Sequence, residues 1–229
     1  MITGATGSLG PTAARRFAEH GANLVLAGSS AEKLEALGQS LGLPKERWLS
    51  AAAALSQPEG AQNVMDEALA KFGKVDILLH LVGGHIGGKP VPQVTEDEIT
   101  TMLRQHLWTT FYLAQVLVPH MTANGWGRLI VITSPSAGAP PAKGLPYAVG
   151  KTAEEALMLT LAEELKGTNI TANIIRVRMI DTQKENTREM MQRESAGTSP
   201  EEITEAMLYL CSDEAGMVNG ARIPLYGSP

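Results

Sequence analysis

Short apolar runs alternate with longer amphipathic segments along the whole chain, and this alternation constrains the fold more than any other feature. The runs are rich in branched aliphatic residues, as expected for strands that are covered on both faces. Strands are predicted at residues 23–27, 47–51, 75–82, 128–133, 171–177 and 222–225. Helices are predicted at residues 11–20, 31–41, 58–72, 95–124, 147–166 and 200–212. This order predicts an α/β fold, a doubly wound parallel sheet with helices on both faces.

Three of the predicted helices are followed by a glycine, Gly21, Gly73 or Gly167, at the position where left-handed backbone often ends a helix. A chain of 229 residues suits one α/β domain, which we expect to span residues 1–229. The polar stretch at 181–199 is predicted to be a mobile insertion between a strand and the last long helix.

Charge and composition exclude several classes of function. The net charge is −5 with acids and bases mixed along the chain, so no basic face for nucleic acid is expected. No apolar run reaches the roughly 18–20 residues of a membrane span, and no signal peptide is recognised. The single cysteine, Cys211, excludes an internal disulfide and fits a reducing compartment. We therefore predict a cytoplasmic protein without a membrane partner or a metal site.

A glycine-rich turn follows a very short apolar segment at the start of the chain and opens the first predicted helix. Its glycines allow a tight turn, and the helix N-terminus offers free N–H groups and partial positive charge to a pyrophosphate. The predicted binding residues of this turn are Thr3, Gly4, Thr6, Gly7, Ser8, Leu9 and Gly10. The alternative, a plain strand-to-helix turn, would need only one of the three glycines.

Tyr147 and Lys151 stand four positions apart on a predicted helix. Positions i and i+4 share one helix face, so the phenol and the ammonium project into the same space. A lysine beside a phenol favours the phenolate, which makes a tyrosine usable as an acid or base near neutral pH. Ser134, thirteen residues before the tyrosine, could hold a carbonyl or alcohol oxygen. The alternative is a half-buried tyrosine next to a solvated lysine.

The ordered set of motifs resembles the short-chain dehydrogenase/reductase family over nearly the whole chain. The matching segments are 3–10, 75–79, 127–134, 147–151, 173–175, 209–215 and 219–220. The resemblance implies a Rossmann fold, NAD(H) or NADP(H), and a small carbonyl or alcohol substrate. It also implies a homodimer or homotetramer, because relatives pair their long helices between subunits.

The same resemblance implies a role for each of the candidate residues. Ser134 would position the substrate oxygen, and Tyr147 would act as the acid or base while the cofactor carries the hydride. Lys151 would hold the nicotinamide ribose and assist the tyrosine. Further cofactor contacts are expected from Val82, Gly83, Gly84, Tyr147, Lys151, Ile180 and Thr182.

Several positions depart from the family pattern. The first strand is truncated to two apolar residues, and the usual Asn-Asn-Ala-Gly reads His80-Leu-Val-Gly83. The Pro-Gly that usually follows the sixth strand is replaced by Val177-Arg178. His106 stands where many members have a relay asparagine, and it is a fourth candidate catalytic residue because histidine can join a proton relay. The alternative for His106 is a buried core or interface histidine.

The end of the second predicted strand bears on the choice of cofactor. An acid there would bond the ribose 2′-OH and repel a 2′-phosphate. This chain has Ser29 and Ser30 instead, with Lys33 close by, which favours NADP(H). Gly7, however, stands where many NADP-using members carry a basic residue, so NAD(H) stays open.

Two alternatives to a generic carbonyl reductase remain. The loop at 81–88 resembles that of dihydropteridine reductases, with His85 in place of their tryptophan, and the segments at 104–110 and 180–188 are also similar to theirs. The second alternative is a non-catalytic Rossmann protein that binds nucleotide weakly, which the shortened first strand and the altered motifs would suit.

Overall fold

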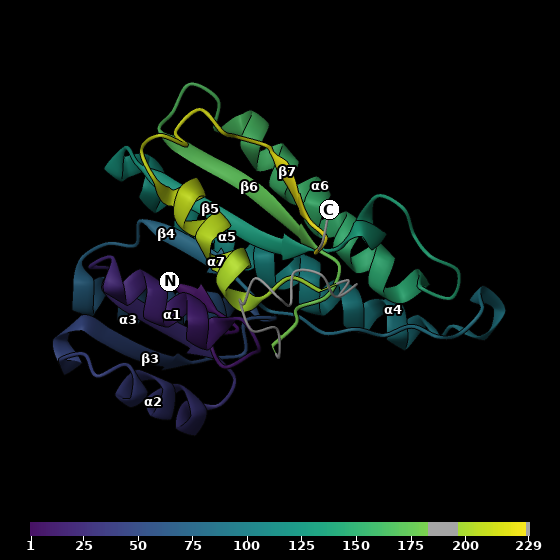
Figure 1. Cartoon of the computed structure of the whole chain (residues 1–229), viewed down its shortest axis with the longest axis horizontal. Coiled ribbons are helices and arrows are strands. Elements are labelled where there is room, and N and C mark those ends of the chain that lie inside the picture. Colours follow the sequence, from purple (N-terminus) through teal and green to yellow (C-terminus); the bar gives the residue numbers. More distant parts are fainter. Residues whose placement is uncertain (183–196, 228–229) are drawn as a thin grey trace, which may run out of the picture.

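Seven parallel strands form one sheet in the computed structural model, which describes residues 1–182 and 197–227. The strand order is β3-β2-β1-β4-β5-β6-β7 (Figure 1). The strands are β1 (Ile2–Thr3), β2 (Leu24–Gly28), β3 (Trp48–Ala52), β4 (Ile77–His80), β5 (Gly127–Thr133), β6 (Ile170–Val177) and β7 (Arg222–Leu225). The predicted doubly wound α/β fold is confirmed, and so is the truncated first strand.

Helices connect successive strands. They are α1 (Gly10–Glu19), α2 (Ala31–Ser40), α3 (Pro58–Phe72), α4 (Glu96–Leu103), α5 (Thr109–Asn124), α6 (Leu145–Glu164) and α7 (Pro200–Cys211). The single helix predicted at 95–124 is α4 and α5 joined by a π-helical segment, Arg104–Trp108. No helix within 1–182 or 197–227 is long and apolar enough to cross a membrane.

The core consists of two apolar layers, one on each face of the sheet. One layer contains buried residues of α3, α5 and α6, and the other contains buried residues of α1, α2 and α7. Neighbouring strand residues point to opposite layers, since Leu78 belongs to the first and Leu79 to the second. Burial on both faces explains why the strands read as continuous apolar runs.

The turn between β1 and α1 requires glycine at two points. Gly4 has a φ of +68°, and a Cβ there would lie 2.7 Å from the carbonyl oxygen of Leu81. A Cβ on Gly10 would lie 2.0 Å from the carbonyl oxygen of Ala5. These close approaches seat the turn against the end of β4, at the carboxyl edge of the sheet where ligands bind in open α/β folds.

A buried histidine links the central strands to α5. Thr109 Oγ1 donates its hydrogen to the carbonyl oxygen of Gln105 at 2.6 Å, so it accepts from His80 Nε2 at 3.2 Å. His80 Nδ1 therefore accepts from Thr3 Oγ1 at 2.7 Å. Burial, and then the charge of Lys151, lower the pKa of His80 from 6.5 to about 3. The imidazole is neutral and joins β1, β4 and α5.

The predicted insertion at 181–199 falls mostly outside the described residues, since 183–196 are not described. Its described ends meet, because Ile180 pairs with Thr198 in a parallel bridge. The Asp181 backbone N–H donates to the carbonyl oxygen of Thr198 at 2.9 Å. Both ends of the stretch are thereby held at the carboxyl edge of the sheet.

The neutral state of His80 makes stability depend on pH. Its folded pKa of about 3 lies below the ordinary 6.5, so the unfolded chain binds more protons between those values and stability falls as the pH falls. We expect His80 to contribute a slope of up to about 1.4 kcal/mol per pH unit below about pH 6.5. Urea unfolding from about pH 7.5 to about pH 5 should show a shallower slope in His80→Gln than in the wild type.

His80→Gln should also be less stable than the wild type at the upper end of that range, because two buried hydrogen bonds are altered. His20→Gln is the matched control, since His20 is exposed on the surface. It should keep the wild-type slope. Equal slopes in His80→Gln and the wild type would contradict a neutral, buried His80.

Candidate active site

Two adjoining cavities lie at the carboxyl edge of the sheet, one of about 420 Å³ and one of about 550 Å³. Both are lined by Gly7, Leu81, Val82 and Gly83, so together they form one continuous site beside the glycine turn. The smaller cavity, which we call the tyrosine cavity, also contains Tyr147 and Lys151. The larger, which we call the serine cavity, extends past Gly28 and Ser29 at the end of β2.

Most of the residues predicted from the sequence line these cavities. The tyrosine cavity is lined by Gly7, Ser8, Leu9, Val82, Gly83, Gly84, Tyr147, Lys151 and Ile180 from the predicted set. The serine cavity is lined by Gly4, Thr6, Gly7, Ser29, Val82 and Gly83. The predicted residues that line neither cavity are Thr3, Gly10, Ser30, His106, Ser134 and Thr182.

Three of these exceptions have structural roles that explain their positions. Thr3 is buried and bonded to His80, and Gly10 packs against the Ala5 carbonyl. Ser30 is the N-cap of α2, where its hydroxyl oxygen accepts from the Lys33 backbone N–H at 3.4 Å. Thr182 is exposed.

The N-terminus of α1 fits an anionic group. Its N-cap residue, Leu9, offers no side-chain cap, and its first turn contains no acidic residue. The N-termini of α2, α4 and α7 are instead capped by Ser30, Thr95 and Ser199. The first N–H groups of α1 are thus free of side-chain caps beside Gly7, which lines both cavities. A dinucleotide pyrophosphate fits this position, because a helix N-terminus with free N–H groups favours negative charge.

Tyr147 lies in the first turn of α6 between two histidine rings. Its ring centroid is 4.8 Å from that of His85 and 5.6 Å from that of His106. His85 belongs to the loop after β4 and lines the tyrosine cavity, whereas His106 belongs to the π-helical segment and is buried. Two separate elements therefore fix the phenol at the cavity wall.

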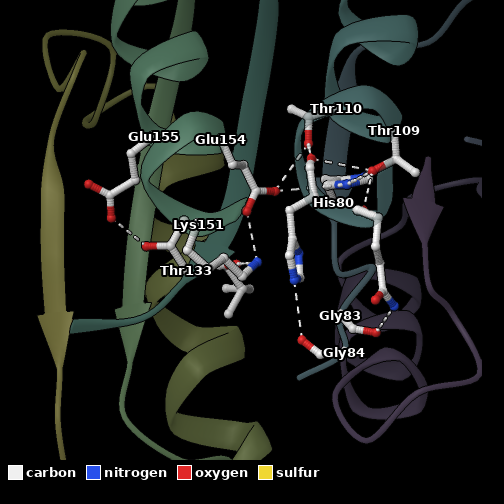
Figure 2. Close-up of polar contacts among 12 residues, drawn as sticks. His80, Gly83, Gly84, Thr109, Thr110, Thr133, Lys151, Glu154 and Glu155 are labelled. Carbon is white, nitrogen blue, oxygen red and sulfur yellow. Dashed lines mark hydrogen bonds and ion pairs between the residues drawn. The ribbon is translucent and has the colours of Figure 1, made fainter. Parts of the chain in front are cut away.

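Lys151 is buried on α6 and has two partners in the protein. Its Nζ donates to the carbonyl oxygen of Ile132 at 2.8 Å and to Glu154 Oε2 at 2.7 Å (Figure 2). Glu154 Oε1 lies 3.1 Å from Thr110 Oγ1, which shares its single hydrogen between Glu154 and the carbonyl oxygen of His106 at 2.7 Å. The pKa of Glu154 is raised above its ordinary value, because burial outweighs the ammonium of Lys151 and the hydrogen bonds from Lys151 and Thr110. An ion pair thus lies directly behind the lining of the tyrosine cavity.

Ser134 directly follows β5, at the start of the loop that leads to α6. Its hydroxyl donates to Ser136 Oγ at 3.3 Å and accepts from the Ser136 backbone N–H at 3.3 Å. The residue is buried, with 6% of its surface exposed. In this arrangement its hydroxyl is engaged within its own turn, and it would have to release Ser136 Oγ to donate to a bound oxygen.

His106 is fully buried next to Tyr147. Its Nε2 donates to the carbonyl oxygen of Gly84 at 3.2 Å, and its Nδ1 is buried without a partner among the described residues. Burial, followed by the charge of Lys151, lowers the pKa of His106 to about 3. A neutral histidine of this kind can accept a hydrogen bond at Nδ1.

Several residues that line the cavities, or that bind a lining residue, lie outside the set predicted from the sequence. His85 was noted only for its loop, and Arg178 only as a departure after β6, but both line the tyrosine cavity. Glu154 was not singled out at all. Its position three residues after Lys151 was the available signal, since side chains at i and i+3 share a helix face.

Comparisons with known proteins identify the family of the chain. The family model described as short chain dehydrogenase matches residues 1–193. The meso-2,3-butanediol dehydrogenase of Serratia marcescens is 27% identical over 235 residues, covering 99% of this chain and 92% of the relative. The 7alpha-hydroxysteroid dehydrogenase of Escherichia coli K12 is 28% identical over 236 residues, covering 99% of this chain and 92% of the relative.

A solved structure is also similar. The 3-ketoacyl-(acyl-carrier-protein) reductase from Brucella melitensis, complexed with NADH, superposes with a TM-score of 0.87 at 25% identity, covering 99% of this chain and 95% of that chain. The family match spans most of the chain, and these relatives are named dehydrogenases or reductases. The chain therefore belongs to the short-chain dehydrogenase family and is an oxidoreductase.

Proposed function

We propose that this protein transfers a hydride between NADP(H) or NAD(H) and a small carbonyl or alcohol substrate, with Tyr147 as the acid or base. The observation that carries the proposal is that Tyr147 and Lys151 line the same cavity as the glycine turn. A proton donor, a cation and a site for a pyrophosphate thus border one space. The non-catalytic alternative gives no reason for all three to meet there.

Different residues of the two cavities would bind different parts of the cofactor. Gly7, Ser8 and Leu9 would hold the pyrophosphate at the N-terminus of α1, and Ser29 would lie near the adenosine ribose. Lys151 would hold the nicotinamide ribose at the end of β5. The bound cofactor would supply or take up the hydride.

Tyr147 would donate or accept the proton of the reaction. In the reducing direction its hydroxyl donates to the substrate oxygen, and in the oxidising direction its phenolate accepts the alcohol proton. Leu9, Val82 and Ile180 supply apolar wall to the cavity and help exclude water.

We expect Tyr147→Phe to lower kcat for ketone reduction by about 100-fold or more, because the variant lacks the proton donor. Diacetyl, ethyl acetoacetate and quinonoid dihydropterin would be assayed with NADPH and with NADH. The last of these tests the dihydropteridine-reductase alternative. Nicotinamide fluorescence should show that Tyr147→Phe still binds the cofactor within about threefold of the wild-type Kd, because loss of one hydroxyl costs little uniform binding.

Tyr209→Phe is the matched control for that experiment. Tyr209 lies on α7 with 53% of its surface exposed, so removing its hydroxyl should leave kcat unchanged. Wild-type turnover by Tyr147→Phe would rule out Tyr147 as the proton donor. Failure of the wild type to bind either nucleotide at millimolar concentration would favour the non-catalytic alternative.

The cofactor preference rests on Ser29 and on the lack of an acid at the end of β2. Ser29 follows β2 directly and lines the serine cavity. A hydroxyl at this place can donate to a 2′-phosphate, whereas a carboxylate would repel it. These features support NADP(H) over NAD(H).

We expect Ser29→Asp to weaken NADPH binding by about tenfold or more and to leave the NADH affinity within about threefold, since the new charge acts on the 2′-phosphate alone. Fluorescence titration with both nucleotides would measure the two Kd values. Ser40→Asp adds the same charge at the far end of α2 and serves as the control. Equal losses of NADPH and NADH affinity in Ser29→Asp would remove the basis for the preference.

We also infer that copies of this chain associate into a homodimer or homotetramer. The support is an aromatic cluster at the start of α5, in which the Trp108 ring lies 5.6 Å from that of Phe111 and 5.7 Å from that of Tyr112. Trp108 is 43% exposed, and a large exposed aromatic of this kind is favoured at interfaces.

Sedimentation velocity at micromolar concentration should therefore show an oligomer for the wild type. Trp108→Glu should shift it towards the monomer, because a charge would be buried in the interface. Val91→Glu replaces an apolar residue that is 65% exposed and lies away from α5, so it should keep the wild-type state. A monomeric wild type would contradict this inference.

A further inference from the structure

Glu154 is a fully buried glutamate that has no role in the proposed reaction as described so far. It lies on α6, one turn after Lys151, and its exposed fraction is 0%. A buried carboxylate is costly unless charged and polar groups surround it. Glu154 meets this requirement with one partner on its own helix, Lys151, and one on α5, Thr110 (Figure 2).

Glu154 accepts from one of the three N–H donors of Lys151 and so limits which donors remain for a bound molecule. A lysine ammonium has three N–H donors and no acceptor. One donates to the Ile132 carbonyl on β5 and a second to Glu154 Oε2, at 2.8 Å and 2.7 Å. Lys151 Nζ makes no further hydrogen bond to the described residues, so one N–H remains for a bound molecule. Because two partners on different elements fix the ammonium, the direction of the third N–H is fixed as well.

The two histidines nearest the pair carry no charge that could balance it. His80 Nε2 from β4 lies 3.9 Å from Glu154 Oε1, and His106 packs against Tyr147 from the π-helical segment. Burial keeps both histidines neutral by lowering the pKa of each to about 3. The charge of Lys151 is therefore balanced by Glu154 and by no other described carboxylate in contact with it.

Glu155, the next residue, binds none of the partners of Glu154 and instead contacts Thr133 and two arginines. Its carboxylate accepts from Thr133 (Figure 2). It also forms ion pairs with Arg176 at 2.6 Å and Arg222 at 2.8 Å. Burial raises the pKa of Glu155, but the bonds to Arg176, Thr133 and Arg222 outweigh it and hold the pKa below its usual range. Two adjacent buried glutamates thus pair with three cations, and of these three Lys151 alone lines the tyrosine cavity.

We propose that Glu154 is a positioning residue for hydride transfer, which holds the Lys151 ammonium against β5 and leaves one N–H for the nucleotide or for Tyr147. The proposal rests on the proposed function. It assigns to a side chain of α6 the task of orienting the lysine and of balancing its charge. It also sets the proton affinity of the site, because a carboxylate beside the ammonium makes the neighbouring groups retain their protons to higher pH.

The test compares Glu154→Gln and Glu154→Leu with the wild type, using the panel ketone that the wild type reduces fastest. Glutamine keeps an acceptor for Lys151 without the charge, and leucine removes both. We expect kcat to fall by about tenfold in Glu154→Gln and about 100-fold in Glu154→Leu, with substrate KM within about threefold. In both variants the alkaline limb of the kcat profile should move to lower pH by about one unit.

Glu155→Gln is the matched control, because it removes an equally buried carboxylate from the same helix turn. It should lower the melting temperature but leave the position of the alkaline limb unchanged. A general structural role for Glu154 would give the opposite pattern, in which both glutamine variants lose stability and the pH profile of the remaining activity stays in place. That pattern would overturn the proposal.

Measuring cofactor binding distinguishes a failure of the role of Glu154 from a failure of the proposed function, and it does not require turnover. Fluorescence titration should show a Kd for the preferred nucleotide that rises about threefold to tenfold in Glu154→Leu and is unchanged in Glu155→Gln, since one hydrogen bond to a charged group is misdirected. If the wild type binds and reduces while Glu154→Gln and Glu154→Leu behave as the wild type does, the role of Glu154 is refuted alone. If the wild type neither binds nor reduces, the proposed function fails and the role of Glu154 fails with it.

Discussion

The hydrogen bond between Thr3 and His80 is the contact on which the rest of the site depends. β1 has two residues, so few ladder bonds hold it between its neighbours, and Thr3 Oγ1 ties it to β4 at 2.7 Å. The glycine turn starts directly after Thr3, and Gly4 packs against the Leu81 carbonyl. The position of Thr3 therefore sets the position of the turn that lines both cavities. His80 extends this connection to α5 through Thr109.

Buried charge is the second organising constraint. Lys151 and Glu154 lie on the buried side of α6, where 3% and 0% of their surfaces are exposed. Two opposite charges can occupy such a position only as a pair with further hydrogen bonds, and here the Ile132 carbonyl and Thr110 supply those bonds. Replacing a buried ion pair by apolar residues is often neutral or stabilising, so the cavity that Lys151 lines explains this pair better than stability does.

The differences between the expected and the observed elements have local causes. The apolar run at 75–82 predicts a strand of that length, but β4 ends at His80 because the chain then turns to line the cavities. The pattern at 95–124 predicts one helix, and a π-helical segment interrupts it at Arg104–Trp108. One extra residue in a turn leaves the hydrophobic periodicity nearly unchanged, so the sequence does not reveal it. This segment brings Gln105 and His106 to the carbonyl oxygens of Gly83 and Gly84.

The sequence by itself determined the alternation of strands and helices, the glycine turn, and the spacing of Tyr147 and Lys151, because each depends on residues a few positions apart. The cofactor and substrate roles of these residues were inferred from resemblance and stay proposals. Tertiary structure alone decided that His85 packs on Tyr147 and that Glu154 reaches Thr110 on α5. Contacts such as the one between Thr110 and Glu154 join residues 44 positions apart. Their geometry follows from how helices pack on the sheet, which no local pattern in the chain specifies.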